Sequence, residues 1–158
     1  NVPSEGLTEA VEKIVKENDE IRKRVRRYSK RLAEYALPYI RGRAEHFMGI
    51  RIYYVIDNEL EESTHIDIGS AAVEKMQDLL YCALIPVNNV VQVIVFSGTQ
   101  AQEKNILARD IANFIASQLG GAAGGDKRFG RGGGRNIDKL NIIKEKMLDY
   151  LRERMVKN

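Results

Sequence analysis

The sequence predicts an α/β domain: a small sheet flanked by helices, with a long N-terminal helical extension and a C-terminal helix. Three observations predict this class. Apolar residues recur at steps of three and four along residues 7–39, which is the spacing of one helix face. Two runs rich in β-branched residues, 50–56 and 90–96, are bounded by turn residues, as strands are. Helical patterns separate and follow these runs, and that alternation favours an α/β arrangement.

The composition limits which functions are possible. The chain has 158 residues, enough for one domain or for one domain with an appendage. The net charge of +3 is modest, so function must depend on where the charges lie. Without a long apolar run or a signal-peptide pattern, we expect no membrane partner. The single cysteine, Cys82, excludes an intrachain disulfide and fits a cytoplasmic protein. The chain opens at Asn1, which indicates a piece of a longer protein.

The helical pattern of residues 7–39 is the clearest in the chain. It resembles a heptad seam, with Asn18 at an a position, where asparagine fixes register and oligomer state. The seam comprises Leu7, Val11, Ile14, Asn18, Ile21, Val25, Tyr28, Leu32, Tyr35 and Tyr39. A helix ending near Pro38 would be about 45 Å long, too long for one face of so small a domain. It needs a partner, either the C-terminal helix or a second copy; the alternative is an ordinary amphipathic helix on its own core.

We expect residues 1–48 to form a helical subdomain that joins two copies into a homodimer, and residues 49–158 to form a globular subdomain. The positions expected to mediate dimerisation are Val11, Ile14, Asn18, Ile21, Val25, Tyr28 and Leu32.

Charge is segregated along this helix. Residues 5–20 contain six acids and two lysines, whereas residues 22–31 contain seven cations and no acid. Lys23, Arg27 and Lys30 share the face opposite the seam, where like charges repel one another unless an anion lies nearby. The run is therefore either a solvated face or a nucleic-acid contact.

The globular part reads as alternating strands and helices. We expect residues 50–56 to form a strand, 69–84 a helix and 90–96 a strand covered on both faces, with further helices over 102–119 and 138–157. Gly120 follows the helix expected over 102–119, at the position where a glycine commonly ends a helix. This order predicts a right-handed α/β unit with a glycine-rich segment leaving its second helix.

Most of the 13 glycines of the chain lie in residues 120–135, among Lys127, Arg128, Phe129, Arg131 and Arg135. Bare backbone can approach phosphate oxygens closely, and the cations add a positive field. We interpret the stretch as a polyanion-binding loop; the alternative is a flexible linker. The spacing matches neither the phosphate loop of nucleotide-binding proteins nor the dinucleotide fingerprint.

Catalytic patterns are missing from the sequence. His46, His65 and Cys82 are not spaced like zinc ligands, so each is expected to have a structural or solvated role. Ser63 lacks the context of a nucleophile, and Glu61, Glu62 and Asp67 are expected to lie in a polar loop. We expect a domain that binds without catalysing, with no cofactor and no metal.

The glycine clusters carry a family resemblance. The strand, helix, strand and helix followed by Gly120-Gly121-Ala122-Ala123-Gly124-Gly125, a short spacer and Gly132-Gly133-Gly134 resemble the DHH-associated domain. That module occurs at the C-terminus of alanyl-tRNA synthetases and in DHH-family phosphodiesterases. Ala122 and Ala123 depart from its more basic, glycine-richer pattern. The spacer Asp126-Lys127-Arg128-Phe129 and the long basic helix are similar to the archaeal synthetase version.

The resemblance implies a non-catalytic domain. In alanyl-tRNA synthetases it contacts the outer corner, or elbow, of the tRNA for alanine, dimerises through its helices, and brings the aminoacylation and editing domains onto one tRNA. The DHH motif, the editing zinc ligands and the synthetase motifs are missing here, as expected for an excised domain. The other readings are the substrate-binding half of a DHH phosphodiesterase and a purely structural dimerisation module.

The expected RNA contacts divide into backbone and side-chain groups. Phe129 either stacks on an unpaired base or anchors the loop in the core. The cations would pair with phosphates, and the glycine amides would approach the RNA closely. The expected RNA-binding residues are Gly124, Gly125, Lys127, Arg128, Phe129, Arg131, Gly132, Gly133, Gly134 and Arg135, with Lys23, Arg27 and Lys30 on the long helix.

Overall fold

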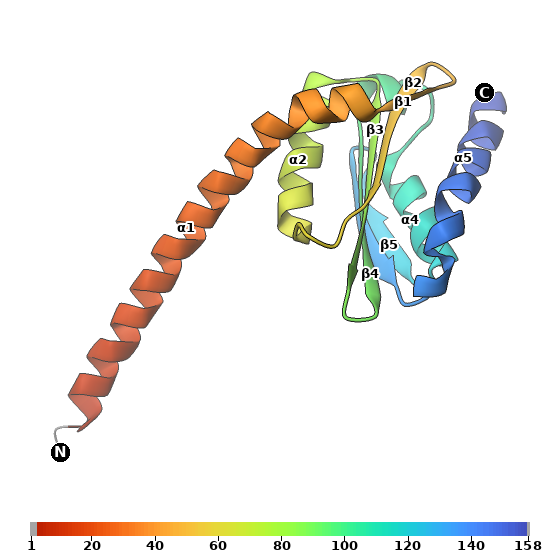
Figure 1. Ribbon diagram of the computed structural model, residues 1–158. Coiled ribbons are helices and arrows are strands. Elements are labelled where there is room, and N and C mark those ends of the chain that lie inside the picture. The colour runs from red at the N-terminus through yellow and green to blue at the C-terminus, as the bar shows by residue number, and fades with distance from the viewer. Residues whose placement is uncertain (1–2, 158) are drawn as a thin grey trace.

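A computed structural model describes residues 3–157 and confirms the α/β class (Figure 1). The N-terminal half holds α1 (Pro3–Arg43), β1 (Glu45–Phe47), β2 (Ile50–Ile56), α2 (Glu62–Lys75), β3 (Leu79–Val87) and β4 (Val90–Ser97). The C-terminal half holds α3 (Thr99–Glu103), α4 (Ala108–Gln118), β5 (Ala122–Gly125), β6 (Phe129–Gly134), a 3₁₀ turn (Ile137–Lys139) and α5 (Leu140–Val156). No helix in residues 3–157 has the length and apolar character needed to span a bilayer.

The six strands form one sheet in the order β1-β2-β3-β4-β6-β5. Only β2 and β3 pair in parallel, joined by the crossover helix α2, and every other neighbouring pair is antiparallel. The expected unit joined the strands at 50–56 and 90–96 through one helix. That expectation was wrong, because β3 lies between them and pairs with both.

The expected helix over 69–84 was half right. Helix α2 ends at Lys75, and the apolar residues that follow form β3. Leu79 to Ile85 are all buried, and their side chains alternate between the two faces of the sheet. A short run that is apolar at every position fits a buried helix and a strand covered on both faces equally well. The elements that pack against the run therefore decide which of the two forms.

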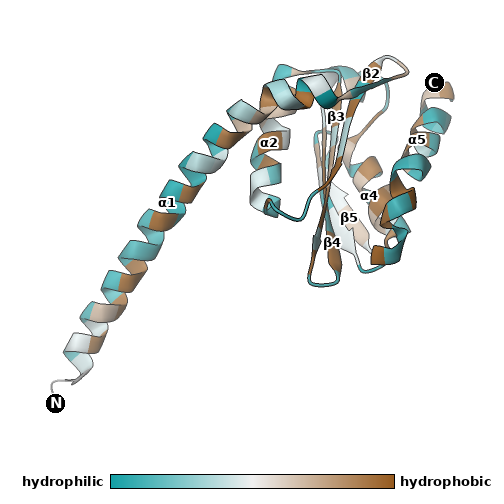
Figure 2. Ribbon diagram, viewed as in Figure 1, coloured by the Kyte–Doolittle hydropathy of each residue, from teal (hydrophilic) through white to brown (hydrophobic). Residues whose placement is uncertain are grey.

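Helices cover both faces of the sheet (Figure 2). On one face, α2 and the C-terminal part of α1 pack over the side chains of Tyr81, Ile94 and Phe96. On the other face, α4 and α5 pack over Leu80, Leu84 and the inward residues of β4. Cys82 lies in β3 within this second core, so the thiol expected on a helix is fully buried in the sheet.

Helix α1 is longer than expected and projects from the body (Figure 1). Its 41 residues span about 60 Å, and Pro38 lies inside the helix instead of ending it. Proline removes one backbone donor, and here the burial of Ala33 and Ile40 against the body holds the helix on both sides of it. From residue 4 to residue 28 every side chain is exposed.

Smaller differences concern helix ends. The expected helix over 102–119 is two helices, α3 and α4, separated at Asn105, whose φ is 63°. Gly120 follows α4 with φ 72°, the left-handed stop that the sequence predicts. The final helix agrees with expectation, beginning with a 3₁₀ turn. The sheet begins at β1, within the segment expected to belong to the helical subdomain.

Candidate nucleic-acid interface

The glycine-rich stretch is a β-hairpin and not an open loop. Strand β6 pairs with β4 on one side and with β5 on the other, so β5 is the edge of the sheet. The glycines permit α4 to lie close to these strands. A Cβ atom at Gly130 would fall 2.6 Å from the carbonyl oxygen of Ala108, and one at Gly134 would overlap the carbonyl of Leu119. The bare backbone therefore accommodates a helix from the same chain.

Sheet pairing changes which glycine backbones can meet a ligand. Gly132, Gly133 and Gly134 lie in β6, between two strands that pair with its backbone on both sides. Gly124 and Gly125 lie in the edge strand and are exposed. Of the glycines expected to bind RNA, those in β5 have an unpaired strand edge.

The hairpin turn over residues 126–128 is fixed to the body. The Asp126 carboxylate accepts hydrogen bonds from the backbone N–H groups of Arg128 (2.8 Å) and Phe129 (2.9 Å), and these bonds lower the pKa of Asp126. The first N–H groups of α4 donate to the turn: Ala108 to the Lys127 carbonyl at 3.0 Å and Arg109 to the Asp126 carbonyl at 2.9 Å. The turn is thus a rigid platform capping α4.

The four hairpin cations do not form one cluster. Lys127 and Arg128 lie at the turn, and Arg135 lies beyond the other end of β6, about 20 Å away along the strand. Arg128 donates to the Ser70 hydroxyl at 3.0 Å and lies over the Phe96 ring, 5.5 Å from its centroid. Arg131 forms an ion pair with Glu62 at the start of α2. All four residues remain exposed, so these contacts do not bury their side chains.

Phe129 is an anchor in this structure. Its ring stacks on Phe96, with centroids 4.6 Å apart, and it packs at the edge of the core beneath α2. Of the two roles left open by the sequence, the geometry favours the hydrophobic anchor over base stacking.

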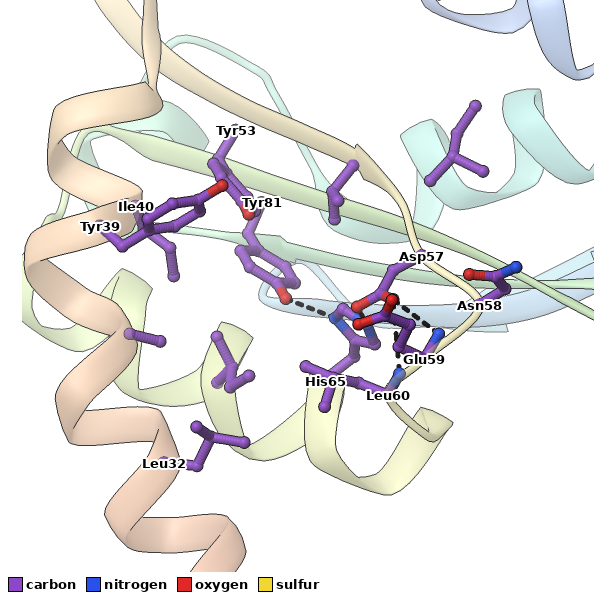
Figure 3. A pocket seen from close by; sticks show the side chains of 14 residues that line it. Leu32, Tyr39, Ile40, Tyr53, Asp57, Asn58, Glu59, Leu60, His65 and Tyr81 are labelled. Atoms are coloured by element: carbon purple, nitrogen blue, oxygen red, sulfur yellow. Dashed lines mark hydrogen bonds and ion pairs between the residues drawn. The ribbon is translucent and has the colours of Figure 1, made fainter.

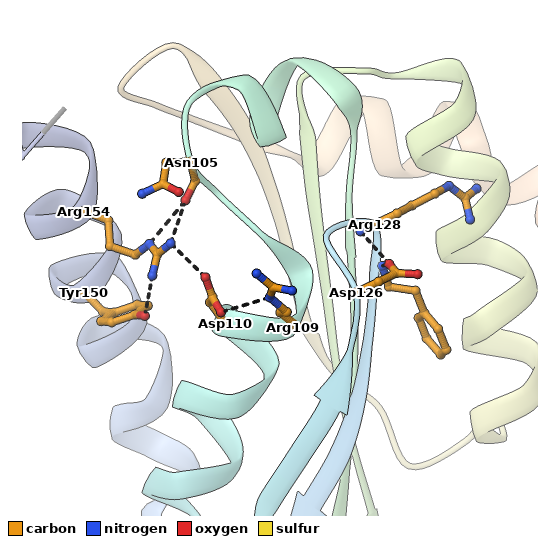
Figure 4. Close-up of polar contacts among 8 residues, drawn as sticks. Asn105, Arg109, Asp110, Asp126, Arg128, Tyr150 and Arg154 are labelled. Atoms are coloured by element: carbon orange, nitrogen blue, oxygen red, sulfur yellow. Dashed lines mark hydrogen bonds and ion pairs between the residues drawn. The ribbon is translucent and has the colours of Figure 1, made fainter.

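A further cation lies at the turn, and no local pattern in the sequence indicated it. Arg109 is the second residue of α4; its side chain is 56% exposed and pairs with Asp110, and its backbone N–H donates to the Asp126 carbonyl at the turn (Figure 4). Figure 4 also shows Arg154 of α5 bonded to the Asn105 carbonyl, Asp110 and the Tyr150 hydroxyl, which ties α5 to α4. Arg109 could not be identified from sequence because only tertiary pairing brings α4 to the hairpin.

The cations expected on the long helix form a separate surface. Lys23, Arg27 and Lys30 are exposed on the part of α1 that projects from the body (Figure 1). Within residues 3–157, no hydrogen bond or ion pair joins them to the hairpin, whose Arg128 and Arg131 contact α2 instead.

A cavity of about 400 Å³ lies between α1 and the start of α2, and its wall contains a buried histidine (Figure 3). The two ring nitrogens of His65 lie 2.9 Å from Asp57 Oδ2 and 2.7 Å from the Tyr81 hydroxyl. Burial lowers the pKa of His65 despite the nearby carboxylate. Burial opposes ionisation of Asp57, but the backbone N–H groups of Glu59 and Leu60 and the imidazole together lower its pKa.

This histidine is structural, as the sequence predicts. Its hydrogen bonds link the end of β2, helix α2 and the central strand β3. Glu62 and Asp67, expected in a polar loop, belong to α2, and Glu61 immediately precedes this helix. Residues 3–157 contain no group of three or more His, Cys, Asp or Glu side chains arranged to hold a metal ion.

No family profile matches the sequence. Among curated proteins, the alanine–tRNA ligase of Methanopyrus kandleri is 35% identical over 147 residues, which is 88% of this chain and 15% of that ligase. The alanine–tRNA ligase of Nitrosopumilus maritimus is 32% identical over 89 residues, 56% of this chain and 10% of the ligase. The chain therefore spans only a small fraction of the relatives it matches.

Solved structures show the same fold. The C-Ala domain of Aquifex aeolicus alanyl-tRNA synthetase superposes with a TM-score of 0.63 at 15% identity, covering 68% of this chain and 96% of that domain. A DHH domain described as a member of the S1p family of ribosomal proteins superposes with a TM-score of 0.54 at 14% identity, covering 77% of this chain and 30% of that protein. Both likenesses concern the fold.

Proposed function

We propose, from the premise that this chain is a relative of the C-terminal domain of alanyl-tRNA synthetases, that it binds tRNA and pairs with a second copy of itself. The domain itself is non-enzymatic. The observation that carries the proposal is the 35% identity to a ligase over 88% of the chain. By this relationship the RNA is the tRNA for alanine, in the cytoplasm, and the domain supports aminoacylation and editing by other parts of the synthetase.

The RNA surface that we propose is centred on the hairpin turn. Lys127 lies on the exposed turn, the Arg128 side chain extends from the turn to Ser70 of α2, and the backbone of Arg109 bonds to the turn, so the backbone of these three cations is held in place. A-form RNA hides its base edges in a deep groove, and the elbow of a folded tRNA is recognised by shape and phosphate position. Arg131 and Arg135 extend the positive surface along β6, and Gly124 and Gly125 provide its open edge.

A gel-shift titration tests the RNA part of the proposal. Folded tRNA and single-stranded RNA of equal length are compared, and folded tRNA is expected to bind more tightly. Replacing Lys127, Arg128 and Arg131 together by alanine is expected to weaken tRNA binding at least tenfold, because three phosphate contacts are lost. Matched replacement of Lys104, Lys144 and Arg152, which contact Gly49, Glu45 and Phe47 at the opposite edge of the sheet, is expected to leave binding unchanged.

Arg128 and Arg131 also make contacts within the fold, so a second variant removes only outward cations. The Lys127→Ala/Arg135→Ala pair leaves the Ser70 and Glu62 contacts intact. Circular dichroism checks that each variant is folded. Unchanged binding by both folded variants would remove the hairpin from the interface.

Self-association is the second part of the proposal. The seam of α1 is exposed throughout residues 4–28, and an apolar stripe of that length is typical of a helix that pairs. Light scattering is expected to give the mass of a dimer, and Ile14→Asp is expected to give that of a monomer. A monomeric wild-type chain would contradict this part alone and leave the RNA part standing.

A further inference from the structure

The two halves of α1 carry opposite charge. Residues 5–20 have a net charge of −4, and residues 22–31 have a net charge of +7. Both blocks lie on the same straight run of helix, and the apolar seam passes through both. The large apolar side chains of the seam range from 40% exposed at Leu32 to 77% exposed at Tyr35. Any partner of this seam must therefore meet an acidic block and a basic block in succession.

We infer that the second copy lies antiparallel on the seam, so that the acidic block of each α1 faces the basic block of the other. This inference rests on the proposed self-association. In a parallel pair the seven cations of residues 22–31 would lie beside the same seven cations of the partner, and like charges at such distances destabilise the pair. In the antiparallel pair the basic residues 22–31 instead face the partner's acidic half, which removes most of this repulsion.

Of the antiparallel registers that pair a with d positions, the one centred between residues 19 and 20 pairs the whole segment 7–32 with itself. In such a pair the a positions pack against the partner's d positions. Val11 then meets the partner's Tyr28, Ile14 meets the partner's Val25, and Asn18 meets the partner's Ile21. Because the symmetry axis passes between residues 19 and 20, the two Asn18 side chains occupy adjacent layers, where their amides can hydrogen-bond.

Flanking charges agree with this register. Glu17 lies beside the seam at a g position, and in an antiparallel pair it faces the partner's Arg24 at the corresponding g position. The twofold symmetry makes this contact twice. Lys23, Arg27 and Lys30 lie opposite the seam and stay exposed in the pair.

The body leaves room for the partner and adds to its docking surface. The helix residues buried on the body begin at Ala33, after the contact segment 7–32. Beside Ile21 and Val25 a groove of about 410 Å³ lies between α1 and α2; its lining includes the apolar Ile66, the basic Arg22 and Arg26, and Asp67, whose carboxylate accepts a hydrogen bond from Ser29. In this register the partner's residues 10–18, which include Glu12 and Glu17, pass along that groove.

Cysteine bridging in the full chain tests the direction. Ile14→Cys and Val25→Cys variants, one of them tagged, are mixed and oxidised, and the products are separated on a non-reducing gel. An antiparallel pair is expected to bridge the Ile14→Cys chain to the Val25→Cys chain. Bridges between identical variants are not expected, because those positions are about 11 residues, or about 16 Å, apart along the pair, and a disulfide requires Cα atoms within about 7 Å.

The controls separate direction from association. A Lys23→Cys variant, on the face opposite the seam, is expected to bridge with neither chain, and native Cys82 is fully buried. If light scattering shows a dimer but only identical variants bridge, the pair is parallel and the inference is overturned while the proposed dimer stands. A monomeric wild-type chain overturns both.

Discussion

At the residue scale, the glycines of β6 are explained by helix packing. Gly130 faces α4 so closely that an added Cβ atom would lie 2.6 Å from a backbone oxygen and 2.7 Å from the Ala112 side chain. A backbone atom cannot move aside to relieve such an overlap, whereas the end of a flexible side chain can. The same segment can still expose cations, because Arg131 points to the opposite face of the strand, towards α2.

A matched pair of substitutions tests this explanation. Gly130→Ala is expected to lower the free energy of unfolding by about 1–3 kcal/mol, the usual cost of overpacking. Gly124→Ala, in the edge strand with nothing within 4 Å of the added atom, is expected to change it by less than about 0.5 kcal/mol. Chemical denaturation followed by circular dichroism measures both. Equal effects would show that the glycines matter for backbone flexibility alone.

His65 makes the stability depend on pH. Its pKa in the fold is lowered by burial, so the unfolded chain binds a proton more readily than the folded chain. The stabilisation is fully present above pH about 6.5, the ordinary histidine value, and is lost as pH falls below it. Asp57, whose pKa is lowered from the ordinary carboxyl value, acts in the same direction only at more acidic pH.

The melting temperature is therefore expected to fall between pH 7.5 and pH 5. His65→Gln is expected to flatten this dependence because the titrating group is removed. His46→Gln, at an exposed position, is expected to retain the wild-type slope. If the His65→Gln chain loses stability as steeply as the wild type, another group controls the acid response.

At the element scale, α1 has two parts with different neighbours. Ala33, Ala36, Leu37 and Ile40 belong to the core beneath the sheet. The part before Ser29, whose hydroxyl donates to Asp67 of α2, is exposed on every side. Isolated helices are marginal in water, so a projecting helix of this length favours a partner.

Removal of residues 1–20 is expected to abolish self-association without affecting the part of α1 that packs on the body. The truncated chain should keep its fold and melt within a few degrees of the full chain, because every buried residue of α1 lies beyond residue 28. Its mass by light scattering is expected to be that of a monomer. Loss of the folded circular dichroism spectrum would show that the projecting part also supports the body.

At the scale of the whole molecule, cations are spread over surfaces and not concentrated in a pocket. The hairpin turn, the far end of β6 and the outer face of α1 each carry exposed lysine or arginine. Such an arrangement suits a large polyanion of fixed shape.

The salt dependence of the tRNA association constant is expected to indicate how many phosphates these cations contact. If the four hairpin cations each neutralise one phosphate, the logarithm of the association constant should fall with the logarithm of salt concentration with a slope of about −2.8 to −3.6. Lys127→Ala is expected to reduce the slope by about 0.7–0.9. Titrations at several salt concentrations measure it, and a slope near zero would contradict phosphate binding.

The sequence by itself determined the features that depend on near neighbours along the chain. The periodicity of α1, the opposite charges of its halves, strands β2 and β4, the stop at Gly120 and the helix at 140–156 are all local patterns, as is the glycine motif that resembles the synthetase family. Each can be read from spacing because a helix or strand repeats over a few residues.

Only the tertiary structure decided the rest. The run at 79–85 is a strand because sheet neighbours and two helical layers bury it on both faces, and the glycine stretch is a hairpin because β4 and α4 lie against it. Partners far apart in sequence likewise place Phe129 on Phe96, His65 between Asp57 and Tyr81, and Arg109 beside the turn. Such contacts join residues that no local period relates, so no spacing rule could have indicated them.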